Sequence, residues 1–186
     1  MNIQINSLTN ANIYIDGVGL LGRADEIEIA NPKHKMIDYK GLGMAGTAEL
    51  WAGVETLEST IKWTSFDATT LTMSTSPFQI HSFQARGNLE QYTSQGRTAQ
   101  LPVVYLMTGI FKDAGSPTFR QHKMVETTSV ISIYHCELYV AGVQIYLYDV
   151  FANIYVGGGV DQLSTFPSNL GGWPGITLKP EDGGDE

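Results

Sequence analysis

This sequence predicts a mainly β, antiparallel fold with one short helix, built as a sandwich or as a barrel-like pair of sheets. Between Leu57 and Phe66, apolar and polar residues alternate, which is the period of a strand with one buried face. Residues 125–140 and 143–156 are rich in Ile, Val, Thr and Tyr, and Ala141-Gly142 between them predicts a long hairpin. Helix signals are scarce in the rest of the chain.

The first predicted strand ends at a literal G-x-G-x-x-G, Gly17-Val18-Gly19-Leu20-Leu21-Gly22. A dinucleotide site of that pattern needs a helix that opens at the third glycine, because the helix N-terminus binds the pyrophosphate. Here Glu26-Ile27-Glu28-Ile29 alternates as a strand does, and Asn31-Pro32 follows. We therefore expect the glycines to turn a hairpin, and we expect no cofactor.

Two more strands are predicted over residues 78–86, ending at Gly87-Asn88, and over residues 101–111, with Pro102 near the beginning of the second. Asp67 is the predicted N-cap of a short helix that ends before Pro77. Predicted loops cover residues 33–48, 87–98, 113–121 and everything after Gly157, with a loop or a single turn near residues 53–56.

The length of 186 residues fits one domain with a substantial core. No apolar run approaches the ~18 residues of a membrane span, and the first residues lack the basic and apolar regions of a signal peptide. Membrane insertion is therefore not expected. Cys136 is the only cysteine, which excludes an internal disulfide and suits a reducing compartment. A net charge of -8 argues against a surface that holds nucleic acid by its phosphates, and suits one that nucleic acid passes without sticking.

The sequence offers no recognisable active site. It contains no phosphate-binding loop, zinc-protease, nucleophile-elbow or calcium-loop motif. No metal-ligand spacing relates the four histidines, His34, His81, His122 and His135. Cys136 is expected to be a small core residue on a face with Val130, Tyr134, Leu138 and Val140.

Asp149 stands among the apolar residues Ile145, Leu147 and Phe151. A carboxylate there needs a partner. We therefore expect a structural carboxylate that accepts backbone N–H groups where the strand bends, with a catalytic acid as the alternative. Five tyrosines crowd the last hairpin, a pattern that suits a carbohydrate-binding face, half-buried strand positions or an interface. They are Tyr134, Tyr139, Tyr146, Tyr148 and Tyr155.

Four stretches of the chain, in their order and spacing, carry a resemblance to a known family. They are Thr9–Gly17; Asn31–Met44, with its Y-[KR]-x-x-G-M loop; Gly53–Glu58; and Asp149 followed by Gly159–Leu163 and Asn169-Leu170. From about Leu8 to Leu170 the chain resembles the major tail tube proteins of contractile-tail bacteriophages, which are closely similar to the tube protein of R-type pyocins. Two features depart from the family. Val150 stands where proline is frequent, and Gly171 to Glu186 extends beyond the usual end.

The resemblance implies a structural subunit and not an enzyme. Six subunits form a ring whose strands join into one continuous inner barrel, and stacked rings form the hollow conduit for DNA ejection. Closure across subunits hides the edges of long strands, which invite aggregation in a monomer. The implied partners are further copies of the chain, the tail sheath, baseplate and tail-terminator proteins, a tape measure protein in the lumen, and DNA in transient passage. The implied location is the tail of the virion, after assembly in the host cytoplasm.

The resemblance also assigns roles to residues. An arm that packs on a neighbouring subunit or ring is expected to include Tyr39, Gly41, Gly43, Met44, Trp51 and Gly53, with Glu58, Thr60 and Thr64 as candidates for the lumen lining. Residues 1–170 form the tail tube domain, and residues 171–186 form an extension with an acidic, flexible end. Three alternatives stay open: a β-sandwich module that binds carbohydrate, an enzyme built around Asp149 or Cys136, and the inner tube of a headless contractile particle.

Overall fold

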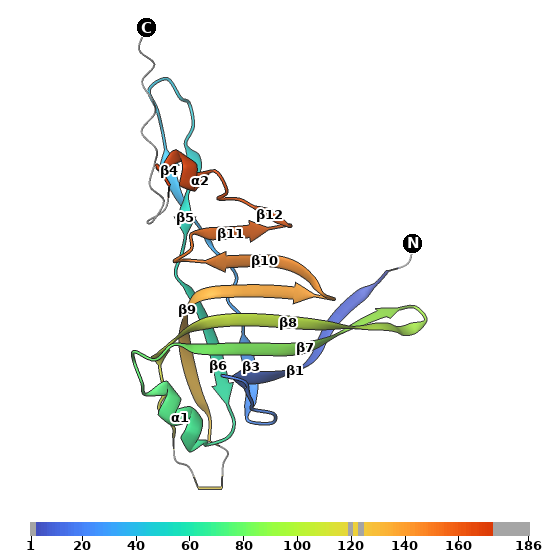
Figure 1. The fold of residues 1–186 in the computed structure, drawn as a ribbon. Coiled ribbons are helices and arrows are strands. Elements are labelled where there is room, and N and C mark those ends of the chain that lie inside the picture. The colour runs from blue at the N-terminus through green and yellow to red at the C-terminus, as the bar shows by residue number, and fades with distance from the viewer. Residues whose placement is uncertain (1–2, 119–120, 123–124, 173–186) are drawn as a thin grey trace.

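The computed structural model describes residues 3–118, 121–122 and 125–172. A 10-stranded antiparallel sheet forms the body, and a separate 2-stranded hairpin, β4–β5, leaves it (Figure 1). The helices are α1 (Ala68–Ser74) and α2 (Phe166–Asn169). The strands are β1 (Ile5–Ile15), β2 (Val18–Gly19), β3 (Ala24–Glu28), β4 (His34–Tyr39), β5 (Ala48–Val54), β6 (Leu57–Trp63), β7 (His81–Thr93), β8 (Gly96–Asp113), β9 (Thr127–Val140), β10 (Val143–Asp149), β11 (Ile154–Gly157) and β12 (Val160–Asp161).

The main sheet has the order β12-β11-β10-β9-β8-β7-β1-β2, and β6 and β3 join it through β9. The predicted mainly β, antiparallel fold is confirmed. Within the described residues the two ends of this order do not pair with each other, so the sheet does not close into a barrel in one subunit.

Strand β9 belongs to two layers. One edge of β9 pairs with β8, and its other edge pairs with β6 over Thr127–Ile133 and with β10 over His135–Val140. Figure 1 shows β9 bending between these two partners. The bend swings β6 and β3 away from β10 and makes them a second layer of a sandwich.

A β-bulge at Tyr134 accompanies the bend, because Thr108 pairs with His135 while Gly109 pairs with Ile133. Before the bulge, Ser129, Ile131 and Ile133 are buried; after it, the buried residue is Cys136. The predicted burial of Cys136 is therefore confirmed. The predicted face, shared with Val130 and Tyr134, is wrong, because the extra residue exchanges the two faces of the strand.

The core lies between the two layers. The alternation predicted for β6 is confirmed, since Leu57, Ser59, Ile61 and Trp63 are buried. The polar groups among them have partners, as burial requires. Trp63 Nε1 donates to Ser129 Oγ at 3.0 Å, and that hydroxyl donates to the carbonyl of Ala114 at 2.9 Å.

The G-x-G-x-x-G stretch contains a tight turn and no helix. Asp16 and Gly17 both have positive φ, 49° and 82°, which suits a two-residue hairpin turn between β1 and β2. The hairpin prediction is correct for this turn. The strand predicted at Glu26–Ile29 does not return to β1, however: β3 crosses to the second layer and pairs with β6.

The hairpin β7–β8 is longer than predicted. Gly87-Asn88 was expected to end a strand, but β7 continues through both residues to Thr93, and Pro102 lies inside β8 opposite Asn88. Gly87 lies within a strand and not in a turn, and the Leu8 side chain packs closely against it. A Cβ atom built there lies 2.8 Å from Leu8 Cδ1. The loop predicted over residues 87–98 is therefore wrong.

Other predicted loops also contain regular structure. Residues 33–48 and 53–56 include β4, its turn and part of β5, and the region after Gly157 includes β12 and the four-residue helix α2. The hairpin arm predicted over residues 143–156 is interrupted between β10 and β11, where Asn153 has a φ of 54°. The helix near Asp67 is confirmed as α1, with Asp67 Oδ1 accepting the N–H of Thr69 at 2.8 Å.

Candidate assembly surfaces

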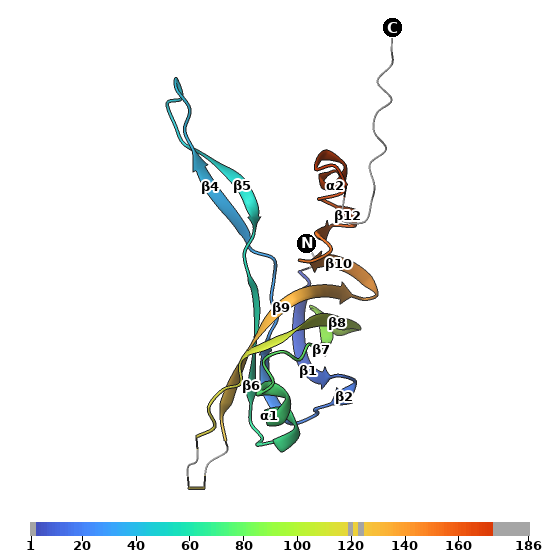
Figure 2. The same ribbon diagram turned by 60° about the vertical axis from the view of Figure 1, so that its left-hand side comes forward.

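The hairpin β4–β5 projects from the body as an arm (Figure 2). Its two strands pair only with each other among the described residues, and a hydrogen bond from Glu55 N to Lys33 O (2.8 Å) closes its base. An isolated two-stranded hairpin is marginally stable in water. The arm nevertheless exposes seven large apolar side chains, Met36, Ile37, Tyr39, Leu42, Met44, Leu50 and Trp51. A surface of this kind marks a site for another protein chain.

The predicted arm residues lie at two levels of this hairpin. Tyr39 ends β4, and Gly41, Gly43 and Met44 form the turn, where Met44 N donates to Gly41 O at 3.2 Å. Trp51 and Gly53 lie in β5, nearer the body. The indole Nε1 of Trp51 donates to His34 Nδ1 at 3.2 Å.

The sequence prediction, an arm from Tyr39 to Gly53, missed Met36 and Ile37, which lie before it in β4. These residues are recognised by their large exposed fractions, which are known only from the structure. The run contains apolar residues without regular alternation, because neither face of the arm is buried in the subunit.

The main sheet also has a free edge. The outer side of β1 pairs with β2 only at Tyr14 and Ile15, so no described strand pairs with that side between Ile5 and Asn12. At the opposite end of the sheet lies β12, which has 2 residues. Unpaired strand edges accept another strand through main-chain hydrogen bonds.

One face of the main sheet points away from β3 and β6, and we call it the open face; its side chains are polar in β7 but mostly apolar in β8, where they are Val104, Leu106, Thr108 and Ile110. It consists of the residues that alternate with buried ones in β7, β8 and β9. In β7, for example, Ser82, Gln84 and Arg86 alternate with the buried Phe83 and Ala85. Two clusters centred on carboxylates lie on this face.

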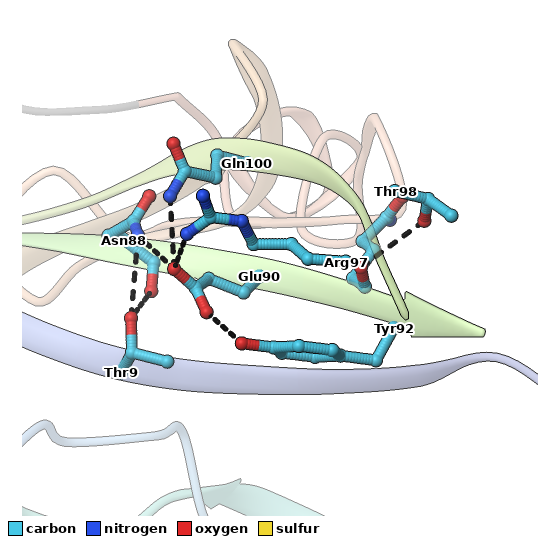
Figure 3. Close-up of polar contacts among 8 residues, drawn as sticks. Thr9, Asn88, Glu90, Tyr92, Arg97, Thr98 and Gln100 are labelled. Atoms are coloured by element: carbon cyan, nitrogen blue, oxygen red, sulfur yellow. Dashed lines mark hydrogen bonds and ion pairs between the residues drawn. The ribbon is translucent and has the colours of Figure 1, made fainter. Parts of the chain in front are cut away.

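The first cluster surrounds Glu90 near the tip of β7–β8 (Figure 3). Glu90 is only 8% exposed, and its carboxylate accepts hydrogen bonds from Tyr92 Oη, Arg97 Nη1 (2.9 Å), Gln100 Nε2 (3.0 Å) and Asn88 Nδ2 (3.3 Å). The hydrogen bond from Tyr92, followed by those from Gln100 and Arg97, lowers the pKa of Glu90 to about 2. The carboxylate therefore stays charged and holds the two strands together at the tip.

The second cluster surrounds His135. Its Nδ1 lies 3.0 Å from Asp149 Oδ2, and its Nε2 lies 2.9 Å from Glu137 Oε1. A neutral imidazole has one N–H, so only the protonated ring can donate to both carboxylates. Burial opposes a charge on Glu137, but hydrogen bonds from Tyr139 and His135 outweigh burial and lower the pKa of Glu137.

Asp149, the predicted structural carboxylate, is the last residue of β10. Its Oδ1 accepts the N–H of Ala152 at 2.7 Å in the turn that follows. The nearby apolar residues Ile145 and Phe151 are exposed, so the carboxylate does not lie in the core. Its second oxygen contacts His135, a partner that the sequence did not reveal because 14 positions separate the two residues.

The predicted lumen residues lie on the outward side of β6 and just after it. Glu58 is exposed and forms an ion pair with Lys112, Thr60 is half-buried, and Thr64 N donates to Arg23 O at 3.0 Å. On the same side of β6, Lys62 pairs with Glu26 at 2.6 Å. Glu58 and Glu26 on this surface therefore each have a cationic partner.

The described residues offer little for catalysis. Burial raises the pKa of the Cys136 thiol to about 11, which disfavours the thiolate that a nucleophile needs. Among the residues that the structure describes, no three His, Cys, Asp or Glu side chains are grouped to hold a metal ion. None of the described helices has the length and apolar character needed to cross a membrane.

A comparison with protein families places the chain in a known family. The family described as Phage tail tube protein FII matches residues 5–171, which is most of the 186-residue chain. The chain belongs to this family. No match was found among curated proteins.

The tail tube family is structural and not enzymatic. The resemblance noted in the sequence is therefore confirmed, and the enzyme alternative is set aside. The chain is a structural subunit of a phage tail tube and a component of the virion tail. Membership also implies self-assembly and association with other tail components. The arm and the free edge of β1 are surfaces on which a tail tube subunit can assemble.

Proposed function

We propose that the chain forms hexameric rings that stack into the inner tube of a contractile phage tail. The supporting observation is that one subunit leaves two surfaces without a partner, the apolar arm and the outer edge of β1. Both surfaces are costly in a dispersed protein, because one exposes apolar area and the other exposes unpaired backbone groups. A ring with stacked neighbours removes both costs.

Ring formation uses the sheet edges. The edge of β1 between Ile5 and Asn12 meets the β10–β12 side of the next copy, and six copies close one continuous barrel. Contacts between different patches on identical subunits make rings when the rotation closes. The arm then packs on an adjacent subunit or ring, through Tyr39, Gly41, Gly43, Met44, Trp51 and Gly53.

The lumen lining has two candidates. Glu58, Thr60 and Thr64 remain one candidate, from the resemblance. The topology favours the open face, because β3 and β6 cover the other face of the main sheet and would lie outside a barrel built from it. The carboxylates of the open face already have their own donors and its β8 positions are mostly apolar, so this face offers few free charges to DNA.

The resemblance to contractile tail tubes implies the other tail components. The sheath surrounds the tube, a tape measure protein fills the lumen during assembly in the host cytoplasm, and baseplate and terminator proteins bind the two ends. DNA crosses the lumen at ejection. The same subunit also suits a headless particle, so micrographs of native particles with or without a capsid separate these two cases.

Negative-stain electron microscopy of the concentrated protein, beside its mass in solution, tests the proposal. Six-fold rings or hollow, striated tubes are the expected result. If the protein is dispersed, the measurement is repeated with the baseplate protein that adjoins the tube as a nucleus. A monomer under both conditions would overturn the proposal, and binding to a glycan panel would then favour the carbohydrate-binding module.

A further inference from the structure

Three tyrosines of β10 and β11 lie beside the base of the arm, and we call them the tyrosine cluster. Tyr148 and Tyr155 are paired across the two strands, and their rings meet edge to face with 5.8 Å between centroids. Tyr146 lies two positions before Tyr148 in β10, so both side chains point to the same side of the sheet, where they pack against the core.

The tyrosine cluster holds the chain just before the arm begins. Tyr146 Oη donates to the carbonyl of Ala30 at 2.8 Å, and Tyr105 Oη donates to the same carbonyl at 3.1 Å. The side-chain oxygen of Asn31 lies 3.0 Å from the Tyr146 hydroxyl. Pro32 follows, and its ring fixes its own φ and restricts the backbone of the residue before it. A stiff connection therefore joins the anchored carbonyl to the arm.

The cluster also contacts the arm itself. The ring of His34, the first residue of β4, lies 5.8 Å from the ring of Tyr155, with 54° between the two planes. His34 Nδ1 accepts the indole N–H of Trp51 at 3.2 Å, so β5 is tied to the same contact. Two hollows of about 510 and 350 Å³ are lined by Trp51 and by Phe166 of α2, so the arm has room to turn on that side.

We propose that Tyr146 and Tyr155 are positioning residues that fix the direction in which the arm leaves the body. The two residues belong to β10 and β11, on the side of the sheet that meets the next copy in the proposed ring. A neighbour that orders these strands also orders the arm, so ring closure favours stacking. This coupling rests on the proposed function, whereas the direction of the arm is a property of one subunit.

Distances between two spin labels in the dispersed subunit test the positioning role. One label is attached at Ala45→Cys in the turn of the arm, and the other at Ser82→Cys in β7; both positions are exposed. The native Cys136 is buried, which protects its thiol from the label. The width of the distance distribution then reports how firmly the arm is held.

The test variant combines Tyr146→Phe, which removes a donor to the anchored carbonyl, with Tyr155→Leu, which removes the aromatic contact. The matched control combines Tyr139→Phe with Tyr155→Phe. Tyr139 loses a hydroxyl that contacts Glu137 on the open face, and phenylalanine at position 155 keeps the ring. We expect one narrow distribution in the control and its loss in the test variant. Circular dichroism at the same temperature ensures that both variants are folded.

An equally narrow distribution in the test variant would overturn the positioning role, and so would a broad distribution in the labelled protein with all its tyrosines. Electron micrographs then test the coupling, because the test variant should form rings that stack less often than those of the control. Equal stacking despite a broad distribution would overturn the coupling. If no protein forms rings, the proposed function fails, while the distances still decide the role of the two tyrosines.

Discussion

Gly109 is the residue that lets β8 stay paired with β9 across the bulge. A Cβ atom at this position lies 2.1 Å from the carbonyl oxygen of Ser132, and the obstacle is backbone and not a flexible side chain. We expect Gly109→Ala to lower the free energy of unfolding by about 2 kcal/mol or more, as overpacking does. Urea unfolding measures the change. Gly157→Ala is the control, because nothing lies within 4 Å of its Cβ, and an equal loss in both variants would refute this reason.

Glu90 gives the subunit a component of stability that depends on pH. The pKa of Glu90 falls from 4.5 to about 2 in the folded state, so its contribution is complete above about 4.5 and is lost as the pH falls toward about 2. We expect Glu90→Gln to destabilise the protein at neutral pH and to flatten the pH dependence in this acid window. Unfolding midpoints across the window measure it. Glu55→Gln is the comparison, and an equally flattened profile there would exclude a special role for Glu90.

Single residues were predictable where their cause is local. The cap formed by Asp67 depends on a residue two positions away, and the sequence showed it. The donors of Glu90 come from both strands of a hairpin that the sequence presented as a loop, so the cluster could not be found. The contact of Asp149 with His135 needs the register of β9 and β10, which a bulge in each strand pair shifts.

The arm is the element whose exposed side chains we expect to decide assembly. Replacing Leu42, Met44 and Leu50 by Ser removes apolar contact area that no part of the described subunit covers. The melting temperature should therefore change little, while polymerisation should be lost. Light scattering follows polymerisation, and circular dichroism follows the fold.

A matched variant of the same arm carries Ala45→Ser, Thr47→Ser and Glu49→Ser. These positions are exposed or half-buried and are not large apolar residues. Normal tubes from this variant, and none from the first, would identify the apolar side chains as the cause. Normal tubes from both would remove the arm from the assembly surfaces.

Elements with one buried face were predictable, and elements without one were not. Strand β6 alternates because its inward side chains meet the core. Strands β4 and β5 bury neither face in the subunit, so their sequence lacks the period that marks a strand. We expect their apolar residues to contact a partner outside the chain.

At the scale of the whole molecule, the two candidate linings of the lumen make opposite predictions. Gln84→Lys with Thr108→Lys adds cations to the open face, and Glu58→Lys with Thr60→Lys adds them to the outward side of β6. Lysines that face DNA bind its phosphates, and salt weakens that binding. We expect the first pair to slow DNA release from otherwise normal particles at low salt. A delay caused by the second pair alone would assign the lumen to Glu58, Thr60 and Thr64.

The fold class and the family were within reach of the sequence, but the arrangement of layers was not. Strand-forming residues and turn glycines predict an antiparallel β protein, whatever the order in which the strands pair. The bulge at Tyr134 decides which strand pairs with each half of the β9 edge. The hydrophobic pattern around Cys136 does not reveal this bulge, because it predicts one regular strand.

A strand shared by two layers has a mechanical consequence. Packed layers that touch only through side chains can slide over each other under load, whereas a backbone that runs through both transmits tension directly. A pull on the layer of β6 therefore reaches the layer of β10 through the peptide chain of β9, and the apolar contacts between the layers do not have to shear first. Each subunit thus has a continuous peptide chain that joins the layer of β3 and β6 to the main sheet.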